Sequence, residues 1–219
     1  MSRRMIRRVL CLCVIGVATA ACMALPGRQV AVFQEPPLPM KGTIPLIAGL
    51  MTLEDARPVD ERRAMRDIEK LPERVTLQIL IDWKDANLFR QLNHVSEPQG
   101  ADVILKGELR SFRWKPSYAW LPYIPALGTL AAFGVPVAYS DDAVEIALDV
   151  IDPKSGQAIA SYTKMAQSHH SYWVYRYQDF TAGDDRQTNS AFRQVADQLQ
   201  TAMLGDRERM VAAVKPAAR

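Results

Sequence analysis

Cysteine is almost absent from this chain of 219 residues, and its three cysteines all lie near the N-terminus, at Cys11, Cys13 and Cys22. Nothing after Cys22 carries a thiol, so no disulfide can form within the rest of the chain. This excludes the class of small domains that rely on disulfide frameworks. Packing alone must therefore stabilise whatever fold follows Cys22.

A long apolar run is also missing. The apolar or small stretch Val9–Ala21 has 21 − 9 + 1 = 13 residues, whereas a membrane-spanning helix needs about 20. Four arginines precede this stretch, and small residues end it at Thr19–Ala21. A basic start, a short apolar run and a small-residue end are typical of a secretory signal. We therefore predict that residues 1–21 are a signal peptide.

The segment Thr19-Ala20-Ala21-Cys22 resembles the lipobox of bacterial lipoproteins. In that family the signal is cut before the cysteine, and the resemblance therefore implies that Cys22 becomes the lipid-carrying N-terminus. Thr19 departs from the usual Leu, Val or Ile at its position. The alternative is an ordinary signal that leaves Cys22 as a free thiol. Ser2–Ile6 also resembles a twin-arginine signal, so the export route stays open.

Net charge of one sign is lacking once the signal is removed. The full chain carries +3, and the signal holds four arginines and no acid, which leaves 3 − 4 = −1 on the mature chain. A chain near neutrality has no bulk attraction for nucleic acid, so we exclude nucleic-acid partners. The remaining 219 − 21 = 198 residues suit one domain with a sizeable core.

The periodicity of apolar residues predicts the order of the elements. Residues 22–42 contain several prolines and are predicted to be a tether. Residues 43–206 are predicted to be a single α/β domain, and residues 207–219 a flexible tail. Expected strands are Thr43–Leu53, Ala101–Trp114, Ala143–Asp152 and Gln157–Ser168, with a turn at Pro153–Gly156.

Three further segments are candidates for helices. Val75–Trp83 fits either a strand or a helix, and we favour the helix because Pro72 suits its first turn. Leu88–Val95 is either a short helix end or a strand. Asp184–Leu204 has one apolar stripe, and Gly205 ends it, so it is the clearest predicted helix.

Two stretches, Gly100–Leu109 and Val144–Ala160, resemble small Gram-negative envelope lipoproteins of the YajG type. They are also similar to the curli-secretion channel subunit and to the N-terminal domain of TolB. The resemblance implies an α+β fold, with a mixed, mainly antiparallel sheet and helices packed on one face. It supplies no catalytic motif, and its members act through binding and assembly, so a non-enzymatic role is expected.

Charge is absent from the 25 positions of Pro116–Ser140, which interrupt the predicted domain as an apolar, proline-rich insertion. Its four prolines and two glycines exclude a regular spanning helix, and prolines in each arm argue against a membrane β-hairpin. It could contact lipid, contact a partner or a second copy, or fold back over the domain. The candidate contact residues are Trp120, Tyr123, Phe133 and Tyr139.

Catalytic signatures are missing as well. The chain has three histidines, and the adjacent pair His169-His170 would point to opposite faces of a strand. No nucleophile elbow, phosphate loop or zinc-protease motif is present. We therefore predict no catalytic residue, no metal site and no cofactor. The aromatic cluster Tyr172–Tyr177 could line a contact face or a glycan site, but we favour a packed strand end.

These observations predict a lipid-anchored, non-enzymatic envelope lipoprotein. Its expected partners are the membrane, through the lipid on Cys22, and an envelope protein involved in outer-membrane assembly, maintenance or transport. Met23, rather than Asp, follows the cysteine, which by resemblance favours the outer membrane, with the domain facing the periplasm. The first alternative is a subunit of an oligomeric secretion or translocation assembly. The second is an enzyme of unrecognised type.

Overall fold

The computed structural model describes residues 38–64, 70–97, 100–118, 138–172 and 177–214. The predicted signal and most of the tether lie outside these residues. The elements in chain order are β1 (Ile44–Leu50), β2 (Glu54–Asp55), α2 (Val59–Ala64), α3 (Leu71–Asp85), β3 (Phe89–His94), β4 (Val103–Tyr118), β5 (Ala138–Ile151), β6 (Ala158–Tyr172), α4 (Tyr177–Gly205) and α5 (Arg207–Val214).

One mixed sheet organises the fold, with the strand order β3-β1-β4-β5-β6 and with β2 added beside β4. The short strand β1 pairs in parallel with β3 and β4. The long strands β4, β5 and β6 pair antiparallel along nearly their whole length, so most of the ladder is antiparallel. The predicted α+β class with a mainly antiparallel mixed sheet is confirmed.

The segment Val75–Trp83, whose sequence fits either a strand or a helix, lies in helix α3. Val75, Ile79 and Trp83 recur every four residues and are all fully buried, as one face of a helix requires. Leu77 and Ile81, which a strand pattern would also bury, are each 50% exposed. Pro72 lies in the first turn of the helix, where a missing backbone N–H costs nothing. The following segment is strand β3.

Helix α4 lies along the same face of the sheet as α3. Its buried stripe of Phe192, Val195, Leu199 and Met203 joins the core cluster. It contacts β5, β6 and α3, and the indole N–H of Trp83 donates to the Ala196 carbonyl at 3.3 Å. The expected placement of helices on one face is confirmed. The helix begins 184 − 177 = 7 residues earlier than its apolar stripe predicted.

Residues 207–214 correct the prediction of a flexible tail, because they form helix α5. Met210 is fully buried in the common core. The Tyr162 hydroxyl donates to Asp206 at 2.9 Å, just before the helix, and the Arg209 guanidinium donates to the Ile159 carbonyl. One buried methionine and two bonds to β6 therefore hold a segment whose sequence is rich in arginine and alanine.

The turn between β5 and β6 follows the predicted pattern. The Asp152 carboxylate accepts from the Lys154 backbone N–H at 2.9 Å and from the Ser155 hydroxyl at 2.7 Å. Gly156 has a φ of +70°, a conformation that glycine adopts without strain. These local bonds hold the pKa of Asp152 below its ordinary value.

Two strands and one side chain cover the edge of β4 that faces away from β5. β1 pairs with Val103–Leu105, and β2 then pairs with Glu108 and Leu109. Beyond β2, the Glu61 carboxylate of α2 accepts from the Phe112 backbone N–H at 3.2 Å and from the Ser111 hydroxyl at 3.1 Å. A side chain thus satisfies a backbone donor where no further strand is present among the described residues.

The end of the predicted tether is docked on the body. Leu38 is buried at 4% exposure, and the Gln200 amide donates to the Pro39 carbonyl at 3.1 Å. The Lys41 ammonium bonds the Asp197 carboxylate at 2.6 Å and the Thr201 hydroxyl at 2.9 Å. The chain therefore enters the fold along the C-terminal half of α4.

Candidate functional site

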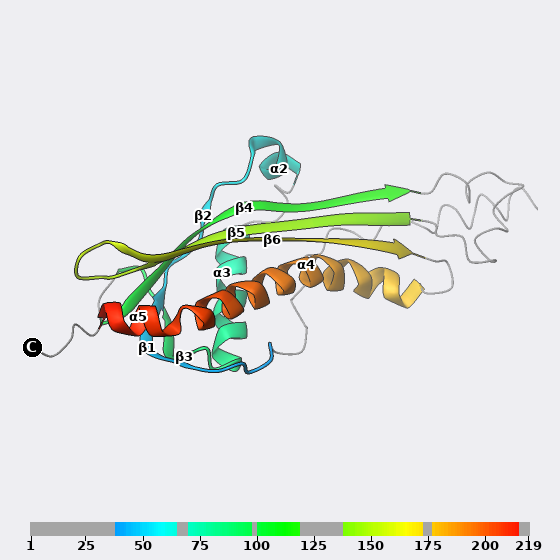
Figure 1. The fold of residues 1–219 in the computed structure, drawn as a ribbon. Coiled ribbons are helices and arrows are strands. Elements are labelled where there is room, and N and C mark those ends of the chain that lie inside the picture. Colours follow the sequence, from blue (N-terminus) through cyan, green and yellow to red (C-terminus); the bar gives the residue numbers. More distant parts are fainter. Residues whose placement is uncertain (1–37, 65–69, 98–99, 119–137, 173–176, 215–219) are drawn as a thin grey trace, which may run out of the picture.

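Three strands carry the chain away from the packed body. The register of β4, β5 and β6 continues to Tyr118, Ala138 and Tyr172, which pair side by side. We call residues 112–118, 138–144 and 166–172 the arm, and its last row of paired residues the distal end. Figure 1 shows this end projecting well beyond α3 and β1, with the start of α4 beside it.

The topology brings two separately predicted segments to this one end. Residues 119–137 connect β4 to β5, and residues 173–176 connect β6 to α4, so both begin and end at the distal end. Their own placement lies outside the described residues. The charge-free insertion and the aromatic cluster Tyr172–Tyr177 are far apart in sequence, and only the strand register makes them neighbours.

The strands extend into the predicted insertion, because Pro116–Tyr118 belong to β4 and Ala138–Ser140 to β5. Of the predicted contact residues, Tyr139 lies on β5 and pairs with Ser117 and Ser171. Trp120, Tyr123 and Phe133 lie outside the described residues. The predicted lipidation site, Cys22, also lies outside them. These residues remain predictions.

A polar hollow lies on the arm, near the distal end. It has a volume of about 280 Å³, and the buried Ala143 lies at its centre between Arg113 and Gln167 of the neighbouring strands. A small side chain between two long ones explains the depression. Its lining residues are Arg113, Asp141, Asp142, Ala143, Gln167, Ser168 and His169.

Of the titratable side chains in this hollow, His169 and Asp141 contact each other, Arg113 contacts α2, and Asp142 accepts from the Ser168 hydroxyl at 3.4 Å. Nδ1 of His169 lies 2.6 Å from Oδ1 of Asp141 on the adjacent strand, and both side chains are more than half exposed. Nε of Arg113 lies 3.4 Å from Oε1 of Glu61. Sequence reasoning missed the pair of His169 and Asp141, because only the register of β5 and β6 reveals it. The arrangement can accept a polar group of a partner by hydrogen bonding.

Metal ligands do not cluster within the described ranges. No group of three or more His, Cys, Asp or Glu side chains gathers among these residues. His94 is distant from the arm, on β3, where its Nε2 lies 3.1 Å from the Thr52 hydroxyl. Among the helices that the structure describes, none is long and apolar enough to cross a membrane.

No protein-family model matches the chain, and no curated protein matches it. Solved structures do match. A DUF330-family protein from Xanthomonas campestris has a TM-score of 0.48 at 12% identity, over 82% of this chain and 95% of that one. Rare lipoprotein B from Shewanella oneidensis has a TM-score of 0.40 at 12% identity, over 74% of this chain and 98% of that one.

A third similar structure is the PelC dodecamer from Paraburkholderia phytofirmans, with a TM-score of 0.38 at 10% identity. The match covers 74% of this chain and 91% of PelC. At these identities the likeness concerns the fold. Bacterial lipoproteins are among the structures similar to this chain, as the sequence resemblance led us to expect.

Proposed function

We propose that this chain is a lipid-anchored lipoprotein of the Gram-negative envelope that binds a protein partner through its distal end and catalyses no reaction. The lipid is carried by Cys22, and the domain faces the periplasm from the outer membrane. The observation that carries the proposal is the arm, which presents two segments rich in aromatic residues at one end of the sheet. One of those segments has no charge over 25 positions.

Charge-free aromatic sequence attached to the distal end favours contact with another molecule, because large apolar patches on soluble proteins mark interaction sites. Aromatic residues are also enriched at the centres of protein interfaces. The adjacent hollow adds polar groups from Arg113, Gln167 and His169 that suit an interface rim. A partner contact therefore uses both the apolar sequence and the polar face beside it.

The tether limits where that partner can be. Residue 38 follows Cys22 by 38 − 22 = 16 residues, which span at most about 55 Å when fully extended. Asp197, where the tether is docked, is 197 − 177 = 20 residues from the start of α4. At the helical rise of 1.5 Å per residue this separation is about 30 Å. The distal end thus stays close to the anchoring membrane, and the partner must reside in the envelope.

The intact mass of the mature chain, purified from membranes, tests the anchor. We expect a chain that begins at Cys22 and carries acyl groups. Cys22→Ser should abolish acylation, whereas Cys11→Ser is the matched control, because Cys11 lies within the predicted signal and should not affect it. An unacylated wild-type chain would overturn the anchor.

Deletion of residues 119–137, with Tyr118 and Ala138 joined by Asn-Gly, tests the distal end. This two-residue turn suits an antiparallel hairpin, so the truncated chain should keep its circular dichroism spectrum. Crosslinking in cells followed by mass spectrometry should then lose the partner seen with the full chain. If the truncated chain keeps that partner, the distal end is not its binding site. A stable ring-sized oligomer in detergent would instead favour a subunit of an assembly.

A further inference from the structure

Strand β6 forms one long edge of the sheet. A register shift against β5 falls at Ile159, and the Arg209 guanidinium donates to the carbonyl of that residue, but no described strand pairs with this edge. Strand β6 is 15 residues long and stands last in the strand order, pairing with β5 from Ala158 to Tyr172. Within the described residues no strand pairs with its other side. Such an edge presents a row of unpaired backbone donors and acceptors.

The other edges differ in this respect. β3 at the opposite edge has only six residues, and β4 is covered by β1, β2 and the Glu61 carboxylate. Proteins block exposed edges with proline, short strands, bulges or charged residues. Strand β6 contains no proline, and Lys164 is its only lysine, arginine or acid. Lys164 is thus the one charge that could block this edge, and a strand that pairs with β6 would have to match it.

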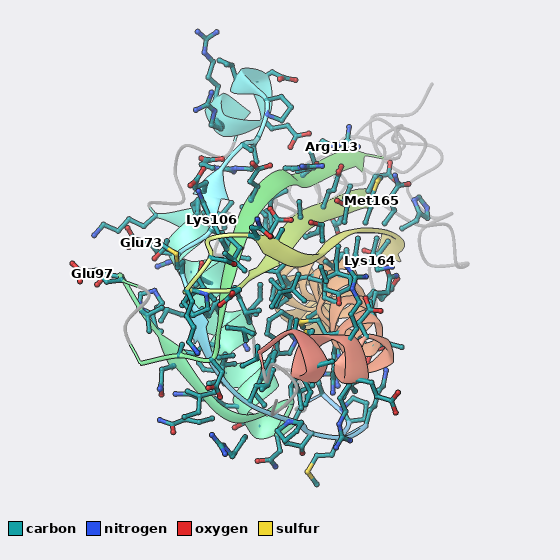
Figure 2. The ribbon with its side chains drawn as sticks, turned by 60° about the vertical axis from the view of Figure 1, so that its left-hand side comes forward. Glu73, Glu97, Lys106, Arg113, Lys164 and Met165 are labelled. Carbon is teal, nitrogen blue, oxygen red and sulfur yellow. The ribbon has the colours of Figure 1, made fainter. Side chains whose placement is uncertain are left out.

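The side chains of β6 alternate between two surroundings. Ala160, Tyr162 and Ala166 belong to the core beneath the sheet, whereas Met165 on the opposite face is 45% exposed. Figure 2 shows Lys164 on the α4 side of β6 and Met165 on the other side. Lys164 is half-buried and forms no ion pair with a described residue. A strand added at this edge would lie beside that unpaired ammonium.

Helix α4 restricts what can be added. It contacts both β6 and β5 along the core face of the sheet. A second copy that paired its own β6 here in the antiparallel sense would place a second α4 on the same face of the sheet, and the two helices would then have to fit against each other. An extended segment with no helix beneath it meets no such obstacle.

We propose that the β6 edge binds an extended segment of a different envelope protein by strand addition, and that this segment places a carboxylate beside Lys164. Backbone hydrogen bonds along Ser161–Gln167 supply the affinity, and the pairing of Lys164 with an acid sets the register. The proposal rests on the proposed partner binding and adds a second contact surface to the distal end.

The test places a photo-crosslinking phenylalanine analogue at Ser161, Thr163, Met165 and Gln167, one position at a time, in the full-length chain in cells. Strand addition predicts crosslinks to one protein, within one continuous stretch. The crosslinked residue should move by two each time the probe moves by two. A chain bound in any other way has no reason to give this ladder. Scattered crosslinks, crosslinks between copies of this chain, or none at all would overturn strand addition.

Charge variants test the role of Lys164. Lys164→Glu should lower the crosslink yield at Thr163 and Met165 about fivefold or more, as the loss of one close charge pair at an interface does. Lys154→Glu, an equal charge change in the exposed β5–β6 turn, should leave the yield unchanged. Lys164→Gln should give an intermediate loss, which keeps the test valid if the reversed charge impairs folding. An unchanged yield in both Lys164 variants contradicts the assigned carboxylate.

A probe at Ser117, at the distal end, separates this proposal from the proposed function. Crosslinks from Ser117 without a ladder from β6 would leave the proposed function standing and refute the edge. The absence of crosslinks at both places would count against partner binding altogether.

Discussion

The packed body and the arm use the same three strands in opposite ways. In the body, residues 103–109 of β4 lie in the sheet between β5 on one side and β1 and β2 on the other. One buried cluster joins α3, α4 and α5 to the sheet. In the arm, the strands keep their pairing, but the face away from the helices is polar and hollowed around Ala143. The core still reaches the base of the arm through Phe112, Val144 and Ala166, and α4 runs beside the three strands toward the distal end (Figure 1). The arm therefore differs from the body mainly in its outer face.

This difference separates stability from binding. Truncations in the body should cost unfolding free energy, whereas changes on the outer face of the arm should cost little and affect partner contacts instead. The two regions can therefore be told apart by measuring stability and crosslinking on the same variants.

Trp83→Ala should have the largest effect on stability, because the indole is fully buried and donates to Ala196 of α4. Removing a buried tryptophan costs about 3–5 kcal/mol, measured by urea unfolding. Leu77→Ala on the same helix is the control, since Leu77 is 50% exposed and its loss should cost less than about 1 kcal/mol. Equal losses in the two variants would deny that α3 joins the core through this face.

Gly107→Val should come next. A Cβ atom at this position would lie 2.6 Å from Leu53 Cδ2 and 2.7 Å from the Ala147 carbonyl oxygen. Because one of these contacts is backbone, the central strands would have to separate, at a cost of roughly 1–3 kcal/mol. Gly205→Ala is the control, since a Cβ atom at that position would meet no other described atom within 4 Å. If the urea unfolding midpoint of Gly107→Val equals that of the wild type, the body tolerates separation of β4 from β5.

Local patterns were sufficient to predict several elements. The spacing of Val75, Ile79 and Trp83 with Pro72 indicated α3, and the residues Pro153–Gly156 indicated the hairpin turn, because each pattern depends on neighbours in sequence. Helix α5 was not predicted. Gly205 ends the apolar stripe of α4. The contacts that hold the next helix are distant in sequence: the bond from Tyr162 to Asp206, the bond from Arg209 to Ile159, and the burial of Met210.

The site was less accessible to sequence reasoning than the fold. The charge-free insertion was visible as a stretch without charge, but its position beside Tyr172 depends on the register of three strands. A one-residue slip in the pairing of a strand would move each of its side chains to the opposite face of the sheet. The parallel placement of β1 between β3 and β4 likewise comes from long-range packing, which no local pattern encodes.

Asp55→Asn tests an ion pair in the body, with a smaller effect that depends on pH. Two side-chain hydrogen bonds from Arg57, at 2.8 and 2.9 Å, hold the pKa of Asp55 below its ordinary value of 3.8. The folded state thus binds the proton less readily than the unfolded state. The stabilisation is fully present above pH 3.8 and is lost as the pH falls through the lower, folded pKa.

We therefore expect Asp55→Asn to lose roughly 1–2 kcal/mol at pH 7, because the buried Arg57 guanidinium loses its charged acceptor. The difference in unfolding free energy between Asp55→Asn and the wild type should shrink as the pH falls below 3.8, the ordinary pKa of Asp55. Glu54→Gln is the control, since Glu54 pairs with Lys106 where both side chains are about half exposed. A gap for Asp55→Asn that does not change with pH would refute the assignment.

His169→Gln in the arm should have the smallest effect on stability. Although Nδ1 of His169 lies only 2.6 Å from Asp141, the two side chains are 59% and 63% exposed, and such surface pairs contribute about 0.5 kcal/mol or less. Urea midpoints should therefore match the wild type, while crosslinking to the partner through the hollow should fall. Gln91→Ala, on the exposed face of β3, should change neither quantity. A stability loss for His169→Gln comparable to that of Asp55→Asn would mean that the arm is held by its outer face as well as by its backbone ladder, and the division between a stable body and a binding arm would fail.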